Sequence, residues 1–214
     1  MALYLNTVSD LLWDSLNTLM DIEDFNDFRI VGGTSLSLQL GHRESVDIDL
    51  FTDAEYGSID FDDLEVILKK TFLYVDSHNI GGVANGRSYF VGNNEDELVK
   101  LDLYYTDPFV FPLLVEDGVR FASLEEIAAM KFEVIANGGR KKDFWDVHEL
   151  LENFTLDQMM VFYSQRNPYG ATREELIDKL IDFEVAEGEF TPNCYKEKDW
   201  DIIKLDFIDL HQNL

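Results

Sequence analysis

Cysteine, proline and long apolar runs are all scarce in this chain of 214 residues. The single cysteine, Cys194, excludes an intramolecular disulfide and a cysteine-rich zinc site. No apolar stretch approaches the roughly 20 residues that a membrane-spanning helix needs. The first residues carry neither the basic segment of a signal peptide nor a lipidation motif. We therefore expect a cytoplasmic protein with no membrane partner.

Basic residues are also scarce. The chain contains 17 Lys and Arg against 43 Asp and Glu, which gives a formal net charge of −26. A surface of this sign repels phosphate backbones, so broad DNA binding is not expected. Hydrophobic residues nevertheless make up 46% of the chain, with only 4 prolines. That composition is typical of a globular protein and excludes disorder as the main state.

Hydrophobic periodicity predicts an N-terminal half that mixes helices and strands. Helices are expected over about 3–20, 35–40 and 61–72, and strands over about 46–51, 72–77, 87–92 and 98–105, with a short β-rich run at 28–34 that ends in two glycines. Gly81, Gly82 and Gly86 mark the turn between the strands at 72–77 and 87–92.

From Ser123 onward the pattern is helical. Capping boxes at Ser123, Thr155 and Thr172 predict three helix starts, and further helices are expected at 142–152 and within the last thirty residues. The predicted class is α+β, with an α/β core at 1–122 and a helical region at 123–214 packed on it.

Asp47 and Asp49 are the sharpest chemical signal. They lie in the alternating segment 46–51, and residues i and i+2 of a strand share one face. Two converging carboxylates repel unless a cation lies between them, and oxygen-only ligands suit Mg²⁺ better than zinc. The alternative is a solvent-facing strand, because two acids with this spacing are common in a chain with 43 of them.

Asp102 lies in a second alternating segment, 99–104. If its strand neighbours the 46–51 strand, three carboxylates meet on one sheet face. A third carboxylate is what a two-metal phosphoryl-transfer site needs to hold both ions.

Gly32, Gly33, Thr34 and Ser35 join a short β-rich run to a helix. Two glycines at that position let backbone N–H groups approach a phosphate closely. The segment matches neither the Rossmann nor the P-loop pattern, and a plain tight turn is the alternative.

Lys131 falls in the apolar stripe of the helix that follows Ser123. An inward-facing cation must meet an anion, which would be a ligand phosphate or a protein carboxylate. Asp143 and Asp146 share one face of the next helix, and either could orient Lys131 or form a structural salt bridge with it. Snorkelling of the lysine to solvent is the remaining alternative.

The segment from Gly32 to Arg43, which runs into 45–51, resembles the AbiEii/AbiGii-type nucleotidyltransferases of the DNA polymerase β-like superfamily. That family includes toxins of abortive-infection and toxin–antitoxin systems. Lys131, followed by Lys142-Asp143-Phe144-Trp145-Asp146, is similar to its second signature. The resemblance covers about residues 25–152.

The resemblance implies a polymerase β-like core with a short mixed sheet and a helical region that closes over the nucleotide. It implies Mg²⁺ on Asp47, Asp49 and Asp102, with Asp102 also the base. It further implies nucleotide binding by Gly32, Gly33, Thr34, Ser35, Arg43 and Lys131, with Asp146 or Asp143 completing the site.

Three functions remain open from the sequence. The first is a Mg²⁺-dependent toxin that moves NMP from an NTP to a tRNA end or a protein hydroxyl, with an antitoxin as partner. The second keeps the chemistry but uses a small cationic acceptor, as in aminoglycoside-modifying relatives, which an acidic cleft would attract. The third is a non-catalytic domain that binds a nucleotide or a basic protein.

Overall fold

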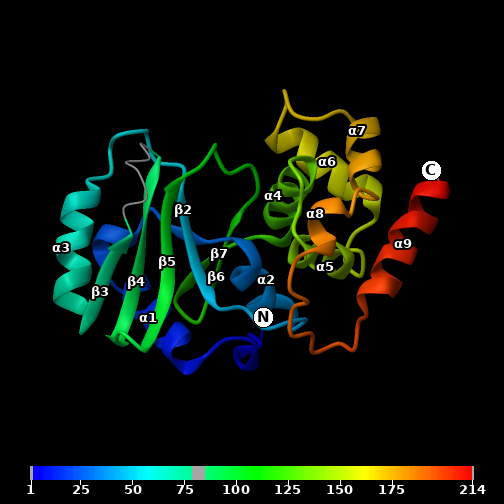
Figure 1. The fold of residues 1–214 in the computed structure, drawn as a ribbon. Helices are drawn as coiled ribbons and strands as arrows, with labels where there is room; N and C mark the ends of the chain where they lie inside the picture. The colour runs from blue at the N-terminus through cyan, green and yellow to red at the C-terminus, as the bar shows by residue number, and fades with distance from the viewer. Residues whose placement is uncertain (1, 79–84, 214) are drawn as a thin grey trace. The chain divides into compact units, whose positions relative to one another are not determined.

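The computed structural model describes residues 2–78 and 85–213, and the chain forms two compact units (Figure 1). Unit 1 comprises Met1–Leu40 and Ser45–Ala122, and unit 2 comprises Gly41–Glu44 and Ser123–Leu214. The expected α+β class is confirmed. The expected packing of a helical region 123–214 on a core 1–122 stays a prediction.

None of the helices in the described residues has both the length and the apolar character needed to cross a membrane.

Unit 1 contains a mixed sheet of seven strands in the order β3-β4-β5-β2-β1-β7-β6. Pairs β2–β5 and β1–β7 are parallel, and the other pairs are antiparallel. The strands are β1 (Arg29–Ile30), β2 (Asp47–Thr52), β3 (Tyr74–His78), β4 (Gly86–Asn94), β5 (Glu97–Tyr105), β6 (Leu113–Glu116) and β7 (Val119–Ala122). The helices of unit 1 are α1 (Asp10–Met20), α2 (Gly32–Leu40) and α3 (Phe61–Thr71), with short 3₁₀ turns at Leu5–Thr7 and Glu23–Phe25.

The sheet differs from the sequence prediction at two places. The β-rich run expected at 28–34 is a strand only at Arg29–Ile30, because α2 already begins at Gly32. The hairpin β6–β7 was not expected, although its two-residue turn is Asp117-Gly118, a dipeptide typical of such hairpins. Both turn residues have positive φ, 49° and 81°. The expected turn at Gly81 and Gly82 lies outside the described residues, whereas Gly86 begins β4.

The expected helix at 3–20 is divided in the structure. Val8 is extended, and Ser9 caps α1 by accepting a hydrogen bond from the Leu12 amide. A side-chain cap satisfies one of the free N–H groups of the first turn, which sets the start of the helix. Residues 5–7 before it form only a 3₁₀ turn.

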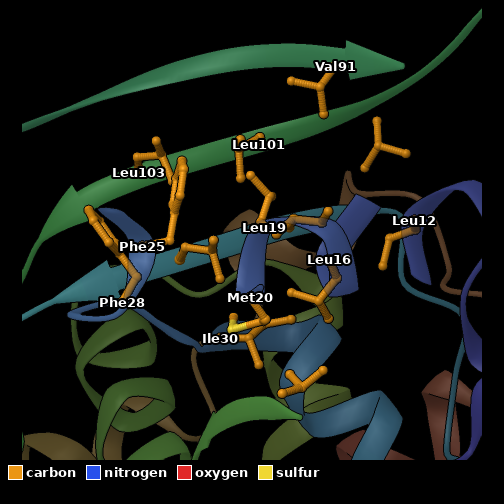
Figure 2. Close-up of a cluster of buried hydrophobic side chains, with 14 of the residues drawn as sticks. Leu12, Leu16, Leu19, Met20, Phe25, Phe28, Ile30, Val91, Leu101 and Leu103 are labelled. Atoms are coloured by element: carbon orange, nitrogen blue, oxygen red, sulfur yellow. The ribbon is translucent and has the colours of Figure 1, made fainter. Parts of the chain in front are cut away.

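One face of the sheet is covered by an apolar core. Figure 2 shows Leu12, Leu16 and Leu19 of α1 beside Leu101 and Leu103 of β5, and all five are fully buried. On β2, Ile48 and Leu50 join the same core, so Asp47 and Asp49, which alternate with them, face away from it. A one-residue slip of β2 would expose both apolar side chains, and the core therefore fixes which residues lie on the opposite face.

Unit 2 is helical in its residues from Ser123 to Asn213. Its helices are α4 (Leu124–Ala136), α5 (Lys141–Leu150), α6 (Leu156–Arg166), α7 (Arg173–Lys179), α8 (Glu184–Glu187) and α9 (Trp200–Gln212). Ser123, Thr155 and Thr172 cap α4, α6 and α7 as predicted. Phe144 of α5 contacts the rings of Trp200 and Phe207, and these contacts hold α9 against α5.

Candidate active site

Three carboxylates share the face of the sheet that is opposite the apolar core. Strands β2 and β5 are parallel neighbours, with Asp49 directly opposite Asp102 and Asp47 opposite Lys100. Residues paired in register on adjacent strands point to the same side of the sheet. The condition set for Asp102, that its strand neighbours the strand of Asp47 and Asp49, is therefore met.

Lys100 is a member of this face that the sequence prediction did not include. Its Nζ donates a hydrogen bond to Asp102 Oδ2 at 2.5 Å. Burial lowers the pKa of Lys100, but the hydrogen bond to Asp102 and the negative charges of Asp102, Asp47 and Asp49 outweigh it, so that the pKa is raised. The alternation at 99–104, which places Lys100 and Asp102 on one side of the strand, was the available signal.

The glycine motif lies directly against the acids. Gly32 has a φ of +66°, and a Cβ added there would lie 2.7 Å from Asp49 Oδ2. The backbone is held in place because the Val31 amide donates to the Asp49 carbonyl at 2.9 Å. Position 32 therefore needs a glycine for two separate reasons, its left-handed backbone and the carboxylate beside it.

Gly32→Ala is expected to destabilise unit 1 and to displace the Asp49 carboxylate. The left-handed backbone alone costs a residue with a side chain about 1–3 kcal/mol, and the contact with Asp49 adds to that cost. Gly57→Ala is the matched control, since Gly57 has a φ of +86° with nothing within 4 Å of the added Cβ. Urea unfolding should show a larger loss for Gly32→Ala than for Gly57→Ala. Equal losses would mean that the Asp49 carboxylate moves aside freely.

Thr34 and Ser35 are buried and use their hydroxyl groups inside unit 1. Thr34 donates to the Asp47 carbonyl and contacts Ser45 Oγ at 2.7 Å. Ser35 Oγ accepts a hydrogen bond from Gln39 Nε2 at 3.1 Å. Thr34 thus anchors the first residue of β2. The role of both residues at a triphosphate stays a prediction, as does that of Gly33.

In unit 2, Lys131 of α4 lies between two carboxylates of α5. Its Nζ is 2.7 Å from Asp143 Oδ1 and 2.7 Å from Asp146 Oδ2. Asp146 also accepts two hydrogen bonds from Arg43, from Nε at 2.7 Å and from the terminal guanidinium nitrogen at 2.8 Å, and contacts His42 Nε2 at 2.8 Å. We call these five residues, His42, Arg43, Lys131, Asp143 and Asp146, the buried ion cluster.

The charges of the buried ion cluster compensate one another. Burial raises the pKa of Asp146, but the positive charges of Arg43 and Lys131 hold it well below its usual value. Burial likewise lowers the pKa of Lys131, while the charges of Asp146 and Asp143 outweigh this and raise it. The sequence allowed two partners for Lys131, a ligand phosphate or a protein carboxylate. The structure shows the second, a salt bridge with Asp143 and Asp146. The bidentate geometry of Arg43 with Asp146 is the strong form of such a pair.

The stability that Asp146 contributes is expected to depend on pH at the acid end. Its folded-state pKa lies well below the ordinary value of 3.8, so its contribution is fully present well above pH 3.8. As the pH falls below 3.8 toward the folded-state pKa, that contribution is lost. The difference in urea midpoint between the wild type and Asp146→Asn should therefore be constant from pH 7 to pH 5 and shrink below pH 3.8. A constant difference down to pH 2 would contradict this assignment.

The chemistry of the donors on the sheet face fits Mg²⁺. Within residues 2–78 and 85–213, no group of three or more His, Cys, Asp or Glu side chains has a ready-made metal-binding arrangement. However, Asp102 Oδ1 is buried and has no hydrogen-bond partner in the described part of the chain. Strands β2 and β5 contain neither Cys nor any His, so the available ligands are carboxylate oxygens. Hard oxygen donors favour Mg²⁺ over zinc.

The predicted site residues thus fall into two sets. Unit 1 brings Asp47, Asp49 and Asp102 together with Gly32. Unit 2 brings together Arg43, Lys131 and Asp146, joined by His42, which the sequence analysis did not include. No local pattern marks His42 for this role, because its partner is 104 residues away in the sequence.

Comparisons with known proteins agree with the resemblance. The family model described as nucleotidyl transferase AbiEii toxin, of a type IV toxin–antitoxin system, matches residues 14–212. The chain is 27% identical over 186 residues to an uncharacterized protein of Aquifex aeolicus, aq_aa25, covering 82% of this chain and 83% of that protein.

Two solved structures are similar in fold. JHP933 from Helicobacter pylori has a TM-score of 0.58 at 19% identity, covering 98% of this chain and 90% of that chain. The nucleotidyltransferase toxin MenT4 from Mycobacterium tuberculosis has a TM-score of 0.61 at 12% identity, covering 94% of this chain and 82% of that chain. With a family model that spans nearly the whole sequence, the assignment is clear: the chain belongs to the AbiEii family of nucleotidyl transferase toxins.

Proposed function

We propose that this protein transfers a nucleoside monophosphate from an NTP to the end of a tRNA or to a protein hydroxyl. The observation that carries the proposal is the group of three carboxylates on one sheet face, with the Gly32 backbone against Asp49. Chance acids on a solvent-facing strand do not explain why a glycine with positive φ lies beside one of them. A site that must admit a phosphate close to the backbone does explain it.

In this proposal Asp47, Asp49 and Asp102 hold Mg²⁺. When bound, the metal would lower the pKa of the attacking hydroxyl and neutralise the departing pyrophosphate. Asp102, whose Oδ1 has no hydrogen-bond partner in the described residues, would also accept the proton of the acceptor hydroxyl. Gly32 and Gly33 would offer backbone N–H groups to the triphosphate, with Thr34 or Ser35 beside them.

We further propose that Arg43 and Lys131 serve the nucleotide phosphates and that Asp146 positions them. Their mutual ion pairs already give these residues a structural role. An ammonium or guanidinium held by a carboxylate is fixed in direction, which is useful for binding a phosphate. The two roles are separable, because loss of positioning lowers NTP affinity whereas loss of structure lowers stability.

Membership of the family supports a proposal about the cellular setting. A toxin of a toxin–antitoxin system implies an antitoxin as counterpart, and we propose a cytoplasmic location, where NTP and tRNA are found. The direct test is to incubate the protein with a cell extract, each of four α-labelled NTPs and Mg²⁺, and then to separate total RNA from total protein. Label in either fraction that is absent with Asp47→Asn/Asp49→Asn supports the proposal. No label in any fraction would contradict it.

A small cationic acceptor is the second candidate, and the net charge of −26 favours it. The same assay distinguishes the two, because an aminoglycoside added to the reaction would then carry the label while RNA and protein remain unlabelled.

A further inference from the structure

Lys100 lies among the three carboxylates, on the face of the sheet opposite the apolar core, so its side chain takes no part in packing that core. It lies in register opposite Asp47, and its Nζ bonds Asp102 Oδ2. The lysine side chain is 39% exposed, whereas that of Asp102 is 15% exposed. The ammonium can therefore leave toward solvent by rotating a long flexible side chain, while the carboxylate stays fixed on its strand.

The charges on this face are unequal. Asp47, Asp49 and Asp102 together carry three negative charges, and Lys100 supplies one positive charge next to them. Asp102 Oδ1 remains buried without a hydrogen-bond partner in the described chain. A divalent cation bound by Asp102 would lie within a few ångströms of an ammonium bound to the same carboxylate. Two positive charges at that separation repel each other, most strongly where water is partly excluded.

We propose that Lys100 is an internal cation that a divalent metal ion displaces from Asp102, and that it thereby sets the metal affinity of the site. Without metal, Lys100 neutralises part of the repulsion among the acids. With metal, the ammonium moves to solvent and Asp102 becomes a ligand. This inference rests on the proposed function, because it takes Asp47, Asp49 and Asp102 to be the metal ligands.

The test measures metal affinity directly. Mn²⁺, which takes the same oxygen ligands as Mg²⁺, is titrated into the full chain at fixed ionic strength, and the free ion is followed by electron paramagnetic resonance. Lys100→Met should bind Mn²⁺ about 10-fold more tightly than the wild type, which corresponds to about 1.4 kcal/mol. Lys100→Arg, which keeps the charge, should retain the wild-type affinity.

Lys69→Met is the matched control. Lys69 lies in the same unit and is paired with Glu65 on the exposed side of α3. The control removes one positive charge without touching the carboxylate face, so any general electrostatic effect appears in both variants. A gain in Mn²⁺ affinity that is equal in Lys69→Met and Lys100→Met would overturn the proposal.

Thermal melts with and without Mg²⁺ give a second measurement, which distinguishes a lysine displaced by metal from a lysine that only stabilises the fold. Without metal, Lys100→Met should melt below the wild type, and saturating Mg²⁺ should raise its midpoint by more than it raises that of the wild type. An equal deficit with and without Mg²⁺ would mean that Lys100 only stabilises the fold. Lys100→Gln repeats both measurements with a polar side chain if the methionine variant does not fold.

Failure of this inference is distinguishable from failure of the proposed function. If wild-type Mn²⁺ binding disappears in Asp49→Asn but Lys100→Met binds no more tightly than the wild type, the acids are ligands and Lys100 is not displaced. If Asp49→Asn binds Mn²⁺ as the wild type does, the acids are not ligands, and both proposals fall together.

Discussion

Replacing Asp49 by Asn is expected to lower nucleotide transfer by about 10³-fold, because a lost metal ligand removes several kcal/mol of transition-state stabilisation. Asp47→Asn should have an effect of similar size. Without metal, neither variant should melt below the wild type, since removing one charge relieves repulsion among the three carboxylates of the sheet face. Transfer is measured with labelled NTP, and stability by thermal melts in the presence of a chelator.

Asp96→Asn provides the control for this pair of variants. Asp96 lies in the exposed turn between β4 and β5, so it reports the effect of losing one negative charge from the same unit. Full activity in Asp96→Asn and loss in Asp49→Asn would assign the effect to the carboxylate face. Unchanged transfer in both Asp47→Asn and Asp49→Asn would contradict the proposed two-metal site.

Asp146→Asn is expected to lower the free energy of unfolding by about 3–5 kcal/mol, the usual cost of breaking a buried ion pair on one side. Asp146 is fully buried, and its loss leaves Arg43 and Lys131 with only part of their compensation. For a protein of this size each kcal/mol moves the thermal midpoint by roughly 2–4 °C. The midpoint should therefore fall by roughly 6–20 °C.

Asp157→Asn is the matched control for this variant. Asp157 pairs with Arg173 at 2.6 Å, but its side chain is 69% exposed, so its removal should cost no more than about 1 kcal/mol. If Asp146→Asn melts like Asp157→Asn and nevertheless loses NTP affinity, Asp146 positions the phosphate-binding cations without stabilising the fold. If Asp146→Asn melts like Asp157→Asn and binds NTP as tightly as the wild type, Asp146 neither stabilises the fold nor positions the cations.

Local patterns in the sequence were sufficient to predict the carboxylate face. The alternation around Asp47 and Asp49 follows from the two-residue period of a strand, and the core residues Ile48 and Leu50 enforce it. The place of Asp102 on this face depended on its strand lying next to that of Asp47 and Asp49. The structure shows that β2 and β5 are parallel neighbours.

Contacts between residues far apart in the chain could not be predicted in the same way. Arg43 and Asp146 are 103 residues apart, and no periodicity within a segment indicates which carboxylate a guanidinium will meet. Lys100 is an intermediate case: the alternation at 99–104 places it on the same side of its strand as Asp102, but only the register of β2 with β5 places it beside Asp47. The hairpin β6–β7 is a different case, because its strands of four residues are too short to show a clear alternation.

The segment Gly41–Glu44 has a consequence for cutting the chain into parts. It belongs to unit 2, although unit 1 supplies the residues on both sides of it. A protease that cleaved between Ala122 and Ser123 would leave His42 and Arg43 on one fragment and Asp146 on the other. The buried contacts among these residues would hold the two fragments together without a peptide bond. A recombinant fragment that begins at Ser123 would instead lack the guanidinium partner of Asp146, and a peptide containing Gly41–Glu44 would supply it.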